Sequence, residues 1–295
     1  MQSRQRSSLP LSSGLVRKCA VYFGALWVDA GMRFAICIEY DGSSFQGWQS
    51  QAHGQTVQDH LETVLSAIAG DPIRTIAAGR TDSGVHALAQ VVHFDATAQR
   101  PLQAWVRGCN ALLPGAIAVR WATPVGEGFH ARFSALSRSY RYVLLNRPVR
   151  PAIQQGHVGW YHRQLDVARM NEAARNLLGE HDFSSFRSAE CQAKTPVKTL
   201  HQAEVARHGD YLIFDFRATG FLQHMVRNVV GALIWIGSGK QPQDWMAELL
   251  AARDRTLAAP TFAPDGLYFT GVEYAAVWQL PQEDRIIAAF DPVAI

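Results

Sequence analysis

Residues 79–87 read GRTDSGVHA and connect two segments that have the residue pattern of β-strands. Residues 73–78 precede this loop and residues 90–94 follow it, and both are rich in apolar side chains. Strand, loop and strand follow one another here without strict β-α-β alternation. The pattern favours an α+β fold with largely antiparallel sheets.

The flanking segments continue this mixture of strands and helices. Residues 34–40 alternate like a strand with one buried face, and Thr56 is suited to cap a helix over 57–68 that ends at Gly70. Residues 105–112 have helical spacing, and residues 117–122 form another expected strand. The second half repeats this order, with strands expected at 140–145, 201–206, 211–217 and 267–273 and helices at 167–178, 222–236 and 242–250.

The repetition predicts two related subdomains, residues 32–137 and 138–280, followed by a tail of residues 281–295. Residues 1–31 have a different composition, rich in Ser and Arg and then apolar over 20–28. A short apolar run after Arg17 and Lys18 resembles a signal peptide, but no clear small-residue cleavage site follows it. We therefore expect residues 1–31 to be a dispensable leader and the functional chain to begin at Met32.

The charge distribution points to a local basic surface rather than a global field. The net charge of +3 comes from residues 1–31, and the rest of the chain is neutral overall. Residues 128–150 contain no acid, five arginines and four aromatic residues, namely Arg132, Arg138, Arg141, Arg147 and Arg150 with Phe129, Phe133, Tyr140 and Tyr142. Arginines bind phosphates and aromatic rings stack on unpaired bases, so this stretch is a candidate RNA contact. A solvated strand whose rings face the core has the same pattern.

Cysteine and histidine spacing gives no sign of a metal site. The four cysteines lie far apart without a C-x-x-C pair, which predicts neither zinc nor disulfides and fits a reducing cytoplasm. The sequence contains no run of 18 or more apolar residues, so it predicts no membrane span. We find no clustered ligand set and no phosphate-binding glycine motif, and we assign no role to His53, His86 or His130.

Asp82 is the candidate catalytic group of the quoted loop. Gly79 and Gly84 permit backbone angles that other residues resist, so the loop can hold Asp82 in a fixed position. Arg80 lies two residues away, and a guanidinium favours the charged form of a carboxylate. A positioned carboxylate can attack an electrophilic carbon or remove a proton. Alternatively, an aspartate in such a turn bonds only its own backbone.

GRTDSGVHA resembles the signature of the bacterial tRNA pseudouridine synthase A family, which usually has Ala where this chain has Ser83. Other segments resemble the family in the same order over residues 33–275, namely IEYDG (38–42), GWQ (47–49), QVVHF (90–94), FHARFSA (129–135), YRY (140–142), DFSSFR (182–187), HMVRN (224–228) and GLYF (266–269). The resemblance implies a pseudouridine synthase fold, with a central mixed, largely antiparallel sheet and a cleft between two subdomains.

The resemblance also implies the activity and the partners. The expected reaction isomerises uridine to pseudouridine in the tRNA anticodon stem-loop, at positions 38, 39 and 40. The expected enzyme is a cytoplasmic homodimer that uses no metal or organic cofactor.

The family's functional residues map onto six positions of this chain. Asp82 matches the catalytic aspartate, which attacks the sugar, attacks the base or removes the C2′ proton. Arg80 is expected to pair with Asp82 and to fill the space left by the flipped nucleotide, although it could be a structural ion pair. Tyr140 is expected to stack on the uracil, and Tyr142, on the same strand face, is its rival.

The other two segments supply three more substrate-binding candidates. Arg227 and His224 lie three residues apart on an expected apolar helix and would share a face. Arg227 needs a carboxylate partner there, and the resemblance offers Asp82. His224 could equally be a core histidine, and Leu267, expected beneath the uracil, could be a core residue.

Three other functions remain open from the sequence. A binding-only RNA protein could use the same cleft, although a carboxylate that faces phosphates would not increase its affinity for RNA. An aspartate-dependent hydrolase or phosphotransferase usually needs Mg²⁺ and further acids, which do not surround Asp82. A pseudouridine synthase for another RNA would have the same residues.

Overall fold

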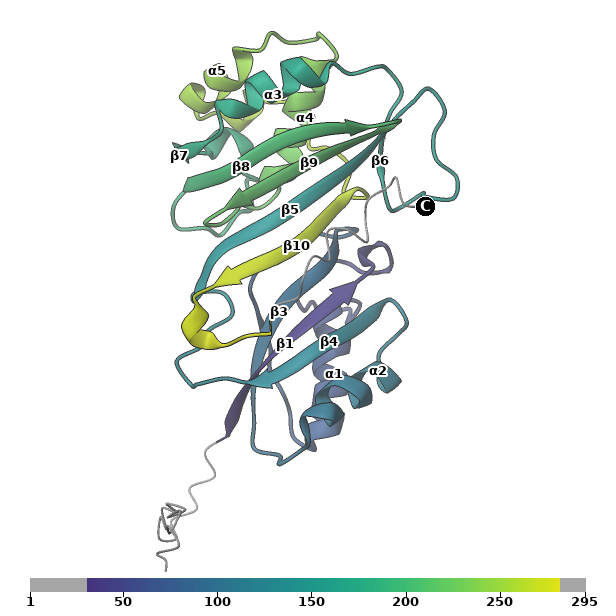
Figure 1. Ribbon diagram of the computed structural model, residues 1–295, viewed down its shortest axis with the longest axis vertical. Coiled ribbons are helices and arrows are strands. Elements are labelled where there is room, and N and C mark those ends of the chain that lie inside the picture. The colour runs from purple at the N-terminus through teal and green to yellow at the C-terminus, as the bar shows by residue number, and fades with distance from the viewer. Residues whose placement is uncertain (1–30, 282–295) are drawn as a thin grey trace, which may run out of the picture. The chain divides into compact units, whose positions relative to one another are not determined.

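One ten-stranded mixed sheet runs through residues 31–281, the part of the chain that this computed structural model describes (Figure 1). The strand order is β4-β1-β3-β10-β5-β9-β8-β7, with β2 beside β3 and β6 beside β5. The strands are β1 (Met32–Tyr40), β2 (Ile76–Ala77), β3 (His86–Ala96), β4 (Ile117–Pro124), β5 (Ala135–Asn146), β6 (Gly159–Tyr161), β7 (Gly179–Asp182), β8 (Val197–His208), β9 (Tyr211–Ala218) and β10 (Leu267–Tyr274).

Strand pairing is antiparallel except where β10 meets β3 and where β6 meets β5. β10 therefore lies between strands of the first half and strands of the second half, and it is antiparallel to β5. This arrangement confirms the predicted α+β class and the mixed, largely antiparallel sheet. It also places the start of β3, the start of β10 and the middle of β5 side by side, because Tyr268 pairs with His86 and Phe269 with Tyr140.

Two groups of helices pack at the two ends of the sheet (Figure 1). α1 (Val57–Ala69) and α2 (Cys109–Leu112) lie beside β1, β3 and β4, whereas α3 (Val167–Arg175), α4 (Met225–Gly237) and α5 (Trp245–Ala252) lie beside β8 and β9. In the described residues, no helix is both long and apolar enough to cross a membrane.

The predicted start and end of α1 are confirmed in detail. The Thr56 hydroxyl accepts the Asp59 N–H, and the Asp59 carboxylate accepts the Thr56 N–H, which satisfies two amides that lack partners in the helix. Gly70 ends the helix with φ of 82°, a left-handed conformation that other residues resist.

Several predicted boundaries differ from the structure. β1 is buried on both faces rather than one, since residues from Phe34 to Ile38 are almost inaccessible. The strand expected at 73–78 is only two residues long, and the helix expected at 105–112 begins as a π-turn over Ala104–Gly108. α4 begins at Met225 rather than 222, because His224 has a left-handed backbone with φ of 63°.

The predicted leader and most of the predicted tail lie outside the described residues. The expected subdomain boundary between residues 137 and 138 falls within β5, a continuous strand. The division into residues 32–137 and 138–280 therefore stays a prediction about related halves of one sheet.

The buried His93 side chain is expected to make the folded protein less stable in acid. His93 on β3 is 3% exposed and accepts the Ala131 N–H at Nδ1, and burial together with nearby His130 and Arg33 lowers its pKa to about 4. Because the unfolded histidine has a pKa of about 6.5, the unfolded chain binds more protons between these values. This contribution to stability is complete above pH 6.5 and is lost as the pH falls towards 4.

We expect the free energy of unfolding to fall by roughly 3 kcal/mol from this group between pH 7 and 4, as measured by urea denaturation. His93→Gln should remove this part of the pH dependence, whereas the exposed control His162→Gln should keep it. Equal pH slopes for wild type and His93→Gln would contradict the assignment.

Candidate active site

The GRTDSGVHA loop is held in place by buried groups on both sides. The Gln90 side-chain amide donates to the Gly79 carbonyl at 2.7 Å, and its oxygen accepts the Gly79 N–H at 3.3 Å. The Tyr40 hydroxyl lies 2.8 Å from the Thr81 hydroxyl, and the Trp48 N–H donates to the Thr81 carbonyl at 3.0 Å. These contacts anchor the residues before Asp82 and leave its side chain at the surface of the loop.

Glycines allow the close packing around this loop. Gly47 has φ of 83°, and a Cβ there would lie 3.0 Å from the Thr81 oxygen and 3.3 Å from the Asp82 carbonyl carbon. Gly84 has the positive φ that we expected, 77°. Gly79 does not, and its role is space, because a Cβ would lie 3.2 Å from the Phe269 ring.

The Asp82 carboxylate faces α4 across the cleft. Its Oδ2 atom accepts a hydrogen bond from Arg227 Nη1 at 3.2 Å and lies 3.5 Å from His224 Nε2. The described hydrogen bonds include none from the loop's own backbone to this carboxylate. The alternative in which Asp82 only stabilises its own turn is therefore not what the structure shows.

Arg227 is placed to hold Asp82. It lies in the first turn of α4 with its side chain 14% exposed, and its Nε donates to the Phe262 carbonyl at 2.8 Å. The second contact fixes the plane of the guanidinium, so that Nη1 points at the carboxylate. The expected contact between Arg227 and Asp82 is present.

His224 reaches the same carboxylate by a different geometry from the one we expected. It precedes α4 instead of lying within it, so the shared helix face with Arg227 is wrong. Its left-handed backbone turns the side chain back towards the loop, and the side chain is 29% exposed rather than buried in the core.

Arg80 does not form the expected ion pair with Asp82. Among the described residues its side chain donates to Gln192 Oε1 at 3.3 Å, an oxygen 112 positions away in the sequence. Arg227 at the start of α4 supplies the positive charge beside Asp82 instead. Arg80 is exposed and lines the same cleft, so it stays available to a substrate.

Tyr140 and Tyr142 differ in their surroundings although both lie on β5. Tyr140 lines the cleft, and its ring packs edge-on against Phe221 and Phe269 with centroids 5.0 Å apart in each case. Burial raises its pKa, so the hydroxyl is neutral. Tyr142 is fully buried and donates to the Ala263 carbonyl at 2.9 Å, which makes it a core residue.

The six predicted site residues line one cleft between the GRTDSGVHA loop, α4 and the start of β10. They are Arg80, Asp82, Tyr140, His224, Arg227 and Leu267. Leu267 is 4% exposed and forms an apolar wall of the cleft. Among the described residues that line the cleft, Asp82 is the single carboxylate. The cleft therefore combines one carboxylate, two arginines and an aromatic face.

The basic stretch of residues 128–150 divides into structural and exposed parts. Arg138 donates to the Ala78 and Thr219 carbonyls, and Arg141 pairs with Asp215 at 2.8 Å. Phe129 is fully buried, while Phe133 is 76% exposed beside Arg132. Much of the stretch thus follows the simpler alternative of a strand with core-facing rings.

Residues that support the loop were missed as site residues. Gln90, Tyr40 and Gly47 lie in segments quoted for the resemblance, yet only the structure shows that each one contacts residues 79–82. A polar residue in an otherwise apolar strand, such as Gln90, was the available signal, because a buried amide needs partners.

Comparisons with known proteins identify the family of this chain. A family model described as tRNA pseudouridine synthase matches residues 36–134 and 173–275. The protein named tRNA pseudouridine synthase A from Aromatoleum aromaticum is 60% identical over 256 residues, which cover 87% of this chain and 97% of the relative. The protein of that name from Chromobacterium violaceum is 61% identical over 251 residues, covering 85% and 96%.

The matched segments include the Asp82 loop, the strand start that follows it and α4, so the cleft residues all lie within aligned regions except Tyr140, which falls between them. A solved dye-decolorizing protein from V. cholerae has a TM-score of only 0.20 with 14% identity, which carries no argument. The cleft and the matches along most of the chain lead to one conclusion: the chain belongs to the tRNA pseudouridine synthase family.

Proposed function

We propose that this protein isomerises uridine to pseudouridine in the anticodon stem-loop of tRNA, at positions 38, 39 and 40, with Asp82 as the catalytic group. The observation that carries the proposal is the Asp82 carboxylate, held 3.2 Å from Arg227 in a cleft that also presents the Tyr140 ring. Membership of the family supports a tRNA substrate, and the anticodon position rests on the resemblance.

The reaction suits a site with one carboxylate, because an isomerisation needs no net oxidation or reduction. The C1′–N1 bond breaks, the uracil turns, and C1′ joins C5, while the proton on C5 is lost and N1 gains one. Atoms and electrons balance within the substrate. In this exchange Asp82 attacks the sugar, attacks the base or removes the C2′ proton. Attack at C1′ would parallel the carboxylate nucleophile of a retaining glycosidase.

The surrounding side chains have separate roles in this proposal. Arg227 and His224 hold the carboxylate in its reactive position, and Leu267 forms the apolar floor under the uracil. Tyr140 offers its ring to the flipped base, which offsets part of the lost stacking. Arg80, which donates to Gln192, is proposed to enter the space left by the flipped nucleotide.

The proposed assembly and compartment follow from the family rather than from the fold. We propose a homodimer in the cytoplasm, and the buried cysteines Cys37, Cys109 and Cys191 are compatible with a reducing compartment.

The test is pseudouridine formation in an unmodified tRNA transcript in the presence of EDTA. We expect product in the anticodon arm at positions 38 to 40. A folded protein that binds the transcript but makes no product would indicate a binding-only protein, and product only on an unrelated stem-loop would indicate another RNA substrate. Activity that returns only with Mg²⁺ would point to metal-dependent chemistry.

Tyr140 allows the ring and the hydroxyl to be separated. Tyr140→Phe keeps the face that packs between Phe221 and Phe269, so we expect its Kd for tRNA to stay within about threefold of wild type. Tyr140→Ala removes the ring and should raise Kd by about tenfold, since base stacking contributes roughly 1–3 kcal/mol. A large loss of affinity in Tyr140→Phe would show that the hydroxyl matters more than the ring.

A further inference from the structure

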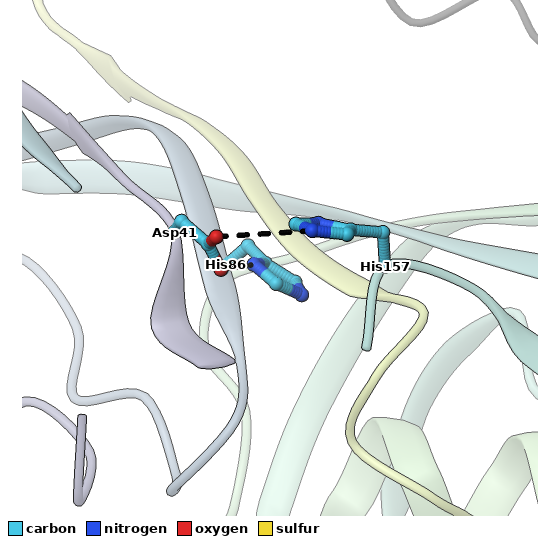
Figure 2. Close-up of side chains that lie close together, drawn as sticks. All are labelled: Asp41, His86 and His157. Atoms are coloured by element: carbon cyan, nitrogen blue, oxygen red, sulfur yellow. Dashed lines mark ion pairs between the residues drawn. The ribbon is translucent and has the colours of Figure 1, made fainter. Parts of the chain in front are cut away.

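One acid and two histidines meet outside the candidate cleft (Figure 2). Asp41 follows β1, His86 is the first residue of β3, and His157 lies in the connection between β5 and β6. Their carboxylate and ring nitrogen atoms all lie within 4.8 Å of one another. Figure 2 shows the three side chains converging from three separate segments of the chain.

The contacts of His86 leave one ring nitrogen facing this cluster as an acceptor. Its Nε2 lies 2.9 Å from the Gly156 carbonyl and 3.1 Å from the Asp265 carbonyl, and carbonyls only accept, so Nε2 carries the proton. The Gly42 N–H donates to Nδ1 at 3.1 Å, so Nδ1 is an acceptor with a lone pair. Metal-binding histidines typically have this arrangement, with the other N–H donated to a backbone carbonyl.

The lone pair on His86 Nδ1 faces the Asp41 carboxylate, which is a second acceptor. Nδ1 lies 3.1 Å from Asp41 Oδ1. Backbone N–H groups of Gly42 and Ser43 donate to these two atoms at 3.1 and 3.0 Å and supply only partial positive charge. Two ligands held about 2.0–2.2 Å from a tetrahedral zinc ion lie about 3.4 Å apart. The observed spacing is therefore close to that of a bound cation, which would replace the Gly42 hydrogen bond.

His157 can complete the set. Its Nε2 lies 3.8 Å from Asp41 Oδ2, and its ring stacks on His86 with centroids 5.3 Å apart. The other face of His86 packs on Tyr268 at 4.7 Å, which fixes the plane of the buried ring. The His157 side chain is 43% exposed, so it can rotate by the small amount needed, and solvent can occupy a fourth position.

We propose that Asp41, His86 and His157 bind one divalent ion of the zinc type, with water as the fourth ligand. Imidazole nitrogens together with one carboxylate favour zinc over Mg²⁺, which takes oxygen ligands. The ion would join the segments after β1 and before β6, which belong to the two predicted halves of the chain. Its role is structural, because the three ligands lie outside the cleft-lining residues.

The test uses the full chain without an affinity tag and compares Zn²⁺ with Mg²⁺. At a hundredfold excess of free Zn²⁺ over its Kd, we expect the melting temperature to rise by about 5 °C, and Mg²⁺ should leave it unchanged. Equilibrium dialysis should give stoichiometric zinc. His157→Ala, at a half-exposed position, should still fold but lose at least tenfold in zinc affinity.

His162→Ala is the matched control, because His162 is an exposed histidine five positions away and outside the cluster. It should bind zinc like the wild type. The proposal is overturned if wild type and His157→Ala bind zinc equally, or if the wild type takes up no zinc at micromolar concentrations. Neither readout uses isomerase activity, so the outcome is independent of the proposed function.

Discussion

Asp82→Asn is expected to lower the rate of pseudouridine formation by at least about three orders of magnitude, because it removes the reacting carboxylate. Asparagine has nearly the same shape, and its amide can still face α4. The folded state and tRNA binding should therefore survive. Single-turnover assays on an unmodified transcript, with thermal melts and a filter-binding Kd, separate these effects.

Asp95→Asn provides a matched control for this substitution. Asp95 also pairs with an arginine, since Arg33 donates to both of its oxygens, but it lies on β3 outside the cleft. It should keep wild-type activity. If Asp82→Asn melts early or fails to fold, Asp82 is a structural residue and the proposed mechanism is wrong.

Arg227→Gln is expected to reduce the rate by about 10²- to 10³-fold, which corresponds to roughly 3–4 kcal/mol. The guanidinium both holds Asp82 and donates to the Phe262 carbonyl, so its loss frees the carboxylate and one wall of the cleft together. Because this contact acts on the catalytic carboxylate, kcat should fall more than KM rises. Steady-state kinetics on the same transcript measure the changes in kcat and KM separately.

Two further variants show whether the geometry or the charge of Arg227 matters. Arg227→Lys keeps the charge but cannot make both contacts, so we expect partial activity. Arg33→Gln removes an arginine from its pair with Asp95 outside the cleft and should leave kcat unchanged. A rise in KM alone for Arg227→Gln, with kcat intact, would contradict a role in holding Asp82.

The local elements of the fold could be predicted because their signals are local. Thr56 and Gly70 mark the ends of α1 by hydrogen-bonding and backbone rules that involve only neighbouring residues. The same rules do not reveal the left-handed His224, which shortens α4 at its start. The apolar run from residue 222 continues the helical pattern, and only packing against the Asp82 loop explains the turn.

The polar contacts around Asp82 were predicted only in part: the resemblance offered Arg227 as its partner, and that contact is present. The expected partner of Asp82 among its neighbours was Arg80, but the structure places Arg80 against Gln192 and Arg227 against Asp82. Both arginines have the same chemistry. Which one pairs with a carboxylate depends on the direction of each side chain, and that direction is set by tertiary packing.

The sequence by itself determined the fold class through its periodic patterns and the family through the order of its short segments. The resemblance in those segments also supplied six of the residues that line the cleft. The tertiary structure decided contacts that were not expected: Arg80 with Gln192, Gln90 with Gly79, and Asp41 with His86 and His157. The physical reason is distance along the chain, since Asp41 and His157 are brought together only when β10 joins the two halves of the sheet.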